Sequence, residues 1–277
     1  MASLKRWIWS EPDSRLYIEK IFMKSSRFAN WEPACRIEPG DYGTLSKRTG
    51  EFLKEGSIFT LPSTAEYAAE HLSIKNGAVD HVQEYVSIEG FRKDFEAGPE
   101  EVEIPGIATA VVKTKYQFTG RRGAVLVMHR PQPRSLDGGV KGIPSTDLRG
   151  KNLVTSVVDC PDYYMFLSQK KAGLVSIVLQ ASAPAAAGVP AGGGANGGWQ
   201  RYGIGGTYKA SEPGQEYTPL YQTVVWDEFD RLRSAPIPDD DDDADEGWVP
   251  AIPPWEVLDS DGEEEPADYY IDANNKD

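Results

Sequence analysis

One segment of the sequence alternates between two faces over its whole length: Val102-Glu-Ile-Pro-Gly-Ile-Ala-Thr-Ala-Val-Val-Lys-Thr-Lys-Tyr-Gln-Phe118. The odd-numbered positions are mainly polar, and the even-numbered positions form an apolar series that includes Val102, Ile104, Ala108, Ala110 and Val112. Alternation of this kind is typical of a strand with one apolar face. Because ordinary strands have about 5–6 residues, this segment predicts an unusually long strand.

The sequence on either side predicts the neighbours of this strand. Upstream, residues 82–88 also alternate, and residues 90–99 contain turn formers, so we expect a long hairpin with its turn at 90–99. Downstream, Gly123–Met128 is apolar on both faces, which is typical of a central, buried strand. Residues 131–152 are rich in proline and glycine and predict a connector.

The long-hairpin pattern recurs nearer the C-terminus. In residues 175–183 the odd positions are apolar, and in residues 201–210 the even positions hold most of the large side chains. The apolar series of this hairpin includes Val175, Ile177, Leu179, Tyr202 and Ile204. Residues 185–198 between the two strands are mostly Ala and Gly, which cannot form a core, and we expect a mobile tip or loop.

The remaining segments indicate an α+β protein. Residues 38–59 predict a strand, a turn and a strand, and residues 65–72 predict a helical segment. We therefore expect a β-rich folded body in residues 1–233. A disordered acidic tail is expected in residues 234–277.

The chain has 29 basic and 43 acidic residues, and the excess of acid is confined to its end. Residues 234–277 contain 16 acidic residues and one basic residue, a net charge of −15. Such a segment is typical of an extended, solvated tail. Residues 105–209 contain 13 basic and four acidic residues, so we expect them to be a basic surface that the tail can mask.

The first 30 residues are basic and aromatic. Ser10 and Pro12 suit the start of a helix, and apolar residues recur at helical spacing from Leu16 to Phe22. This helix either docks on a sheet or binds anionic lipid. The candidate lipid-binding residues are Lys5, Arg6, Arg15, Lys20, Lys24 and Arg27.

The sequence contains no recognisable motif for catalysis or metal binding. The three histidines are isolated, the two cysteines lie 125 positions apart, and there is no P-loop or nucleophile elbow. We therefore expect neither an enzyme nor a cofactor. Nucleic-acid binding is not expected either, because no stacking motif accompanies the basic residues. The two thiols and the lack of a signal sequence predict a cytoplasmic protein.

Three stretches together resemble gasdermin-like pore-forming proteins of filamentous fungi. They are Gly40-Asp-Tyr-Gly43 running to Glu51-Phe-Leu-Lys-Glu-Gly56, then Arg122-Gly-Ala-Val-Leu-Val-Met128, and Glu216-Tyr-Thr-Pro-Leu-Tyr221. The resemblance rests on their order and on the long hairpins, and it covers roughly residues 35–226. Animal gasdermins have a large folded C-terminal inhibitory domain, whereas here 44 residues follow Arg233.

The resemblance implies a pore-forming domain with a twisted, mainly antiparallel β-sheet and a few helices, which serves regulated cell death. Such a protein binds acidic phospholipids, oligomerises with copies of itself, and refolds two sheet extensions into hairpins of a transmembrane β-barrel in the cell membrane. The apolar series of the two hairpins are then the candidate membrane-facing residues. In this family a C-terminal segment commonly keeps the protein inactive until proteolysis removes that segment. Candidate cleavage positions are Phe229 and Leu232 for a subtilisin-like protease, and Arg231 and Arg233 for a metacaspase.

Because screening weakens diffuse charge pairing, we also expect an apolar contact of the tail with the body. The residues expected to make it are Trp248, Val249, Ile252, Trp255 and Val257. Two alternative interpretations of the sequence remain beside a pore-forming protein. One is a β-rich binding or scaffold protein whose acidic tail recruits a basic partner, and the other is an enzyme or nucleic-acid binder.

Overall fold

The computed structural model describes residues 13–88, 90–93, 110–119, 122–138, 140, 142–143, 146–169, 173–180, 198–203, 205–226 and 248–255. In these residues three antiparallel sheets, here called A, B and C, and two α-helices make an α+β fold. This confirms the α+β class and the mainly antiparallel pairing expected from the sequence, although the strands form three sheets and not one.

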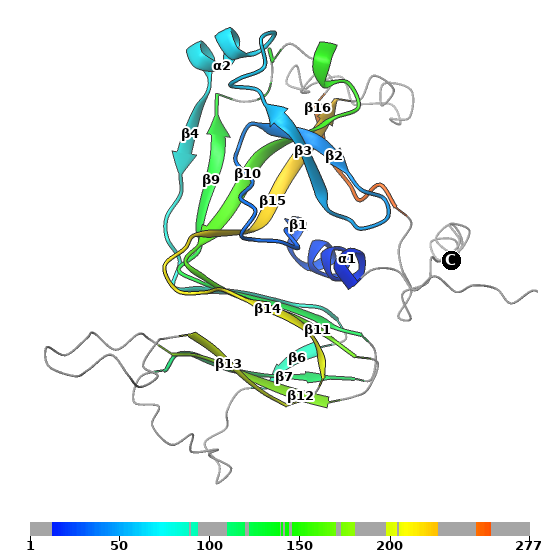
Figure 1. Cartoon of the computed structure of the whole chain (residues 1–277), viewed down its shortest axis with the longest axis vertical. Helices are drawn as coiled ribbons and strands as arrows, with labels where there is room; N and C mark the ends of the chain where they lie inside the picture. The colour runs from blue at the N-terminus through cyan, green and yellow to red at the C-terminus, as the bar shows by residue number, and fades with distance from the viewer. Residues whose placement is uncertain are drawn as a thin grey trace, which may run out of the picture.

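Sheet A has eight strands and forms the upper part of the molecule (Figure 1). Its main path runs β1-β15-β10-β2-β3, with β16 paired to β15, β9 paired to β10, and β4 paired to β9. The strands are β1 (Phe28–Ala29), β2 (Asp41–Leu45), β3 (Phe52–Ser57), β4 (Ser73–Asn76), β9 (Gln132–Asp137), β10 (Asn152–Cys160), β15 (Tyr217–Trp226) and β16 (Trp248–Pro250).

Sheets B and C have four strands each and lie stacked in the lower part of the molecule. Sheet B has the order β14-β11-β8-β5, with β5 (Val82–Val86), β8 (Ala124–His129), β11 (Asp162–Ser168) and β14 (Gly206–Ala210). Sheet C has the order β13-β12-β7-β6, with β6 (Gly90–Lys93), β7 (Ala110–Phe118), β12 (Gly173–Gln180) and β13 (Gly198–Gly203).

Four lines of chain run through all three sheets in the same lateral order. They are β4-β5-β6, β9-β8-β7, β10-β11-β12 and β15-β14-β13, and each line pairs with its neighbours in sheets A, B and C alike. The molecule is thus built on one four-stranded ribbon bent twice. We call the first bend the A/B corner (residues 77–81, 130–131, 161 and 211–216) and the second the B/C bend (the described residues 87–88, 119, 122–123, 169 and 205, with the flanking Ser168 and Thr207).

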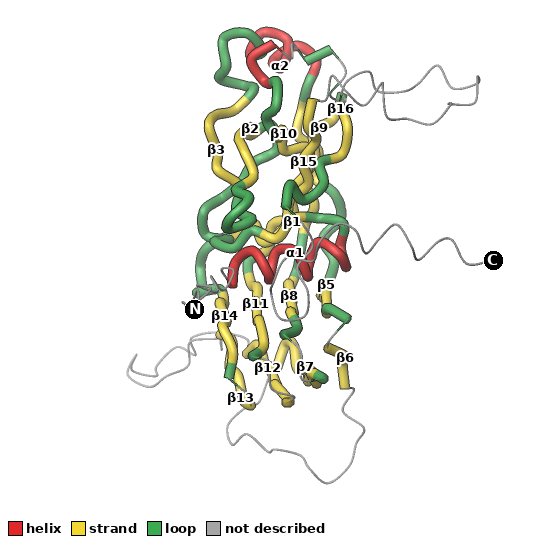
Figure 2. Tube along the Cα trace, turned by 90° about the vertical axis from the view of Figure 1, so that its right-hand side faces the viewer, coloured by secondary structure: helices red, strands yellow, loops and turns green. Residues whose placement is uncertain are grey.

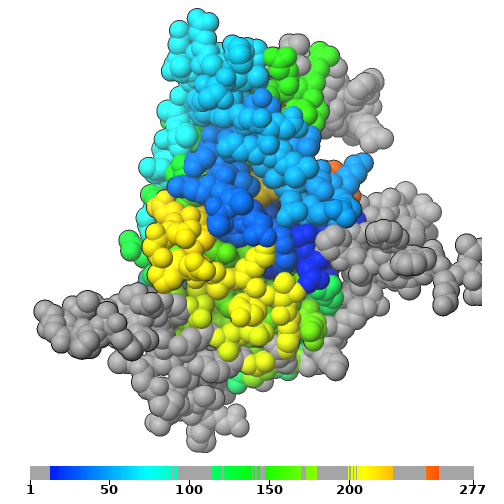
Figure 3. Space-filling model, viewed as in Figure 1, coloured from blue at the N-terminus to red at the C-terminus, as the bar shows by residue number. Residues whose placement is uncertain are grey.

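Helix α1 (Asp13–Ser25) lies between sheets A and B and crosses the strands of sheet B (Figure 2). Its apolar residues Leu16, Tyr17 and Ile21 are buried, and the Tyr17 hydroxyl donates to the Val125 carbonyl at 3.1 Å. The second helix, α2 (Ala65–His71), and the 3-10 turn Thr146–Leu148 lie at the far end of sheet A. Both expected helices are therefore present. Seen as a surface, the blue N-terminal part of the described chain crosses the middle of the molecule above the yellow residues near 210 (Figure 3).

Several predictions about individual strands are confirmed. Gly123–Met128 holds the central, buried strand β8, in which Ala124–Met128 are fully buried. The strand-turn-strand unit at 38–59 is β2 and β3. Both cysteines are free, with Cys35 exposed and Cys160 buried.

Other predictions are wrong. Residues 90–93 are strand β6 rather than part of a turn, and β6, not the strand at 82–88, pairs with β7. The connector expected at 131–152 contains strand β9, which pairs on both sides. The single return strand expected at 201–210 is divided at 204–205, where Gly203 has a φ of 122° and approaches the Leu174 carbonyl too closely for a side chain.

Candidate functional site: the folded-back sheet and the C-terminal strand

Sheet C folds back over sheet B and hides an apolar surface between them. The cluster enclosed by the two sheets contains Tyr116, Phe118, Val125, Val127, Tyr164, Phe166, Val175, Ile177 and Leu179. All nine are at most 3% exposed. On the outer face of sheet C, Lys115, Gln117 and Ser176 are half-buried, whereas Val178 is buried.

The register of sheet C tests the expected faces of the two hairpins. Val175 is opposite Tyr116, Ile177 is opposite Thr114, and Leu179 is opposite Val112, so these pairs share one face. A register shift then places Ala110 opposite Gln180 instead of in this series. Residues 102–109, with Val102, Ile104 and Ala108, lie outside the described part of the chain.

The return strand of the second hairpin was assigned to the wrong face. The register partner of Ile177 is Arg201, and that of Leu179 is Trp199, whereas Tyr202 is opposite Ser176. Pairing therefore aligns the odd positions of β13 with the buried series and Tyr202 with the outer one. Ile204 lies outside the described residues.

Polar contacts also join sheet C to sheet B. The Glu84 carboxylate of β5 accepts from the Arg92 guanidinium at 2.6 Å and from the Tyr116 hydroxyl at 2.7 Å. Burial and the neighbouring Glu84 raise the pKa of Tyr116, so its hydroxyl stays protonated as a donor. At the opposite edge the Trp199 indole donates to the Ser211 hydroxyl at 3.2 Å.

The B/C bend is contacted by the first residue of α1. Asp13 accepts a hydrogen bond at 2.6 Å from Arg122, which lies in the β7–β8 link, and one at 2.5 Å from Thr207, near the start of β14. Arg122 also donates to the Ser168 carbonyl, at the end of β11, at 3.5 Å. Burial raises the pKa of Asp13, but the hydrogen bonds from Thr207 and Arg122 outweigh burial and lower it overall. The carboxylate is therefore ionised at neutral pH.

The C-terminal segment joins the body of the protein. Trp248–Pro250 forms β16 and pairs antiparallel with Val224–Trp226 of β15. Trp248 packs in the cluster around Ile58 and Leu148, and Trp255 packs in the cluster that holds α1. The expected apolar contact is confirmed for these two tryptophans, and Val249 is half-buried. The prediction is wrong for Ile252, which is 75% exposed, and Val257 lies outside the described residues.

This docking also corrects the expectation that the whole tail is disordered. We expected residues 234–277 to be disordered and solvated, but residues 248–255 are an ordered part of the body. The Arg15 guanidinium lies 5.9 Å from the centre of the Trp255 ring, which joins the tail to the first turn of α1. The candidate cleavage positions Phe229, Arg231, Leu232 and Arg233 lie outside the described residues, as does the proposed boundary at 233–234.

The candidate lipid-binding residues do not share one surface. Arg15 is 2% exposed and Lys20 is 7% exposed, so neither can meet a lipid surface in this conformation. Lys24 is exposed and Arg27 is half-buried. Lys5 and Arg6 lie outside the described residues.

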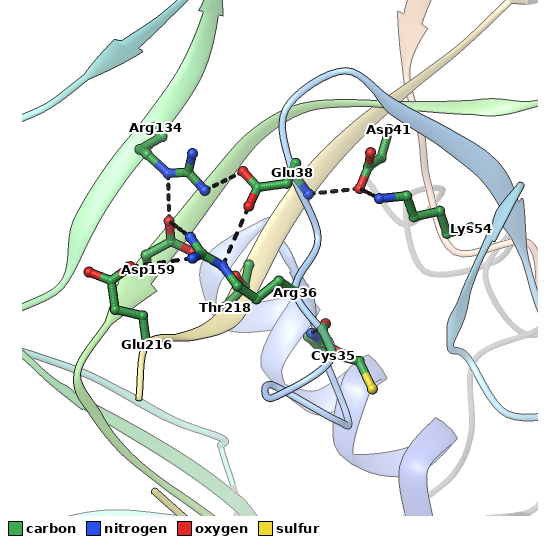
Figure 4. Close-up of polar contacts among 10 residues, drawn as sticks. Cys35, Arg36, Glu38, Asp41, Lys54, Arg134, Asp159, Glu216 and Thr218 are labelled. Atoms are coloured by element: carbon green, nitrogen blue, oxygen red, sulfur yellow. Dashed lines mark hydrogen bonds and ion pairs between the residues drawn. The ribbon is translucent and has the colours of Figure 1, made fainter. Parts of the chain in front are cut away.

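A network of charged residues holds the A/B corner (Figure 4). The Asp159 carboxylate at the end of β10 accepts from Arg134 of β9 at 2.5 Å and from Thr218 of β15 at 2.6 Å. Glu38 binds the other side of Arg134 at 2.5 Å, and Arg36 lies within 3.5 Å of Glu38, Asp159 and Glu216. Burial lowers the pKa of Arg134, but Glu38 and Asp159 outweigh this and raise it. Three of the four lines of the ribbon are thus joined at this corner.

Among the described residues, no group of three or more His, Cys, Asp or Glu side chains is placed to hold a metal ion. No helix in the described ranges is long and apolar enough to span a bilayer. No protein-family model matches the sequence, and no curated protein matches it significantly.

Sequence reasoning missed the contacts that hold sheet C in place. Asp13 and Arg122 are 109 positions apart, and Glu84 and Tyr116 are 32 apart, and no local pattern links either pair. The only sequence signal was indirect. A strand with one apolar face must hide that face somewhere when no membrane is present.

Proposed function

We propose that this protein is a latent pore-forming protein of the gasdermin type. The observation that carries the proposal is the twice-bent ribbon, whose last third has an apolar face closed against sheet B. With the B/C bend straightened, the chain from Ala110 to His129 and the chain from Asp162 to Gln180 are each far longer than the ~9–11 residues that a membrane strand needs.

The same ribbon supplies two hairpins. Residues 73–137 form one and residues 152–226 form the other, and the two pair side by side in every sheet. Strands in hydrocarbon need partners at both edges. We therefore propose that activated copies pair edge to edge into a closed ring, with acidic phospholipids as the first binding partner. In a cell this would make the protein cytoplasmic while latent and membrane-bound, and lethal, once activated.

The docked C-terminal segment supports a role for the tail in latency. It covers an edge of β15 and packs on α1 through Trp255, so its loss would uncover both. We propose proteolysis between Phe229 and Ser234 as the activating event. A subtilisin-like protease or a metacaspase is the proposed activator. No enzymatic activity, cofactor or nucleic-acid binding is proposed.

The test uses a chain that folds complete and is cut afterwards. A recognition sequence for a site-specific protease replaces residues 229–233, and dye leakage from liposomes with and without acidic lipid is followed before and after the cut. We expect leakage only after the cut and only with acidic lipid. A cut chain that stays monomeric and leaves liposomes intact would favour the binding or scaffold protein with an acidic recruiting tail.

A further inference from the structure

The B/C bend carries a contact that does not belong to the ribbon. Of the described residues at the bend, Arg122, Ser168 and Thr207 come from three of the four lines, yet the carboxylate that joins Arg122 to Thr207 is Asp13 of α1. Beside it lies an open cleft of about 430 Å³ lined by Asp13, Arg122, Leu167, Ser168, Gln169, Gly206 and Thr207. The polar contacts of Asp13 therefore lie at the edge of a solvent-accessible cleft.

The other side of the same helical turn contacts the tail. Arg15, two residues after Asp13, lies under the Trp255 ring at 5.9 Å. Gly50 permits the close packing here, because a Cβ atom at Gly50 would lie 3.1–3.3 Å from atoms of Ile18, Arg15 and Trp255. Positions two apart on a helix point to different sides. The first turn of α1 therefore bridges the C-terminal segment and the B/C bend.

We infer that the ion pair of Asp13 with Arg122 is a latch that keeps sheet C folded on sheet B, and that the first turn of α1 transmits the state of the tail to this latch. While Trp255 is docked, α1 is held on both sides and Asp13 bridges Arg122 and Thr207. Loss of the tail uncovers Arg15, α1 can move away from the bend, and Asp13 leaves with it. The membrane consequence rests on the proposed function, whereas the latch itself is a property of the uncut chain.

The test measures amide hydrogen exchange of the full-length, uncut chain by mass spectrometry. Asp13→Asn and Arg122→Glu each remove the ion pair. We expect the amides of β7 and β12 in sheet C to exchange up to about fivefold faster in both variants, as removal of a partly exposed ion pair allows, with β10 of sheet A unchanged. The double variant Asp13→Arg/Arg122→Glu restores an ion pair of reversed sign, and its exchange should return towards that of the unmodified chain.

A matched control is the ion pair of Glu55 with Lys151 in the sheet A region. Its 2.7 Å distance and the 38% exposure of Glu55 resemble the 2.6 Å and 39% of Asp13 with Arg122. Glu55→Gln should leave sheet C unchanged. The latch is refuted if sheet C in Asp13→Asn exchanges as in the unmodified chain, or if all three sheets exchange faster together, since the second result indicates general destabilisation.

The transmission is tested by combining the cut with the variant. Cutting the tail should speed exchange in sheet C of the unmodified chain and add little in Asp13→Asn, because both changes release the same contact. Full additivity would contradict transmission through α1. Liposome leakage is followed in parallel, and a cut chain that opens sheet C without leakage would refute the proposed function and leave the latch standing.

Discussion

The ribbon bends twice, and the two bends are held in different ways. At the A/B corner the ribbon is pinned by its own residues, with Asp159 and Arg134 largely buried and the 36–38 segment completing the network. At the B/C bend the joining carboxylate comes from α1 and is 39% exposed. One bend is held by side chains of the ribbon and of the 36–38 segment, and the other by a partly exposed carboxylate of α1. Under the inferred latch, the B/C bend is the one that opens while the rest of the ribbon stays folded.

The largest expected difference between the two bends is in the free energy of unfolding that a substitution at each bend costs. Asp159→Ala removes one of the two carboxylates that lie 2.5 Å from Arg134 and also the acceptor of the Thr218 hydroxyl, and hydrogen bonds to a charged group contribute about 1.5–3 kcal/mol. We expect a loss of this size in the free energy of unfolding, measured by urea denaturation. The matched variant Asp13→Ala should cost at most about 1 kcal/mol, because partly exposed ion pairs contribute little. Similar losses for the two variants would contradict the distinction between the bends.

The next effect concerns release of the tail without cleavage. Trp248→Ala with Trp255→Ala removes two large buried side chains from the C-terminal segment, and changes of this kind cost about 3–5 kcal/mol each in a core. We expect the uncut double variant to lose docking of the tail and to leak acidic liposomes partially. Ile252→Ala is the control, since Ile252 is 75% exposed. If docking is lost with no rise in leakage, the tail does not hold the B/C bend.

A smaller effect is expected for lipid binding by α1, the element that leaves the bend. Lys24 is exposed, and a basic residue near an anionic surface contributes about 1 kcal/mol. Lys24→Glu should therefore weaken sedimentation of the cut chain with acidic liposomes by roughly thirtyfold, because it removes one positive charge and adds a negative one. Asp137→Lys, on exposed Asp137 of sheet A, tests whether any charge change has this effect. Unchanged binding by Lys24→Glu would remove Lys24 from the lipid surface.

The smallest effect is that of mild acid. Folding lowers the pKa of Asp13, so its contribution to stability is present above the unfolded-state pKa of about 3.9 and is lost as the pH falls through the lower, folded value. We expect exchange in sheet C, corrected for the intrinsic pH dependence of amide exchange, to be unchanged from pH 7.5 to pH 5. Opening of sheet C within that range would show that another group controls the bend.

Local alternation was enough to predict that residues 110–118 and 173–180 are strands and that each has an apolar face. It could not predict the bends, because β8 and β11 are apolar on both faces and alternation gives no sign of which face meets which layer. Strand β9 was missed because Pro133 and Arg134 interrupt any strand pattern, although the strand pairs on both sides.

The candidate site was predicted less well than the fold. The tryptophans of the tail were found because apolar residues in an acidic segment need a partner, but the pairing of β16 with β15 has no local signal. Arg15 and Lys20 were grouped with the lipid-binding residues by charge alone, and both are buried. Contacts between distant positions, such as Asp13 with Arg122, follow from the bends, and so they could not be predicted before the bends were known.

The spacing of buried residues along the lines β9-β8-β7 and β10-β11-β12 determines which residues share a face once the B/C bend is straightened. Phe118 and Val125 lie in the same cluster seven positions apart, and Phe166 and Val175 lie in it nine positions apart. In a straight strand, positions an odd number apart point to opposite faces. Straightening therefore continues the face of Phe118 with Ala124, Leu126 and Met128, which now pack in the cluster that contains α1.

That face becomes continuous only after α1 has left sheet B. Arg122 belongs to the same even-numbered series, between Phe118 and Ala124, and a long cationic side chain near an apolar face keeps its charge at the level of the lipid head groups. Under the proposed function, the Arg122 guanidinium therefore lies at the level of the lipid head groups on this face, and sheet C lies deeper in the bilayer.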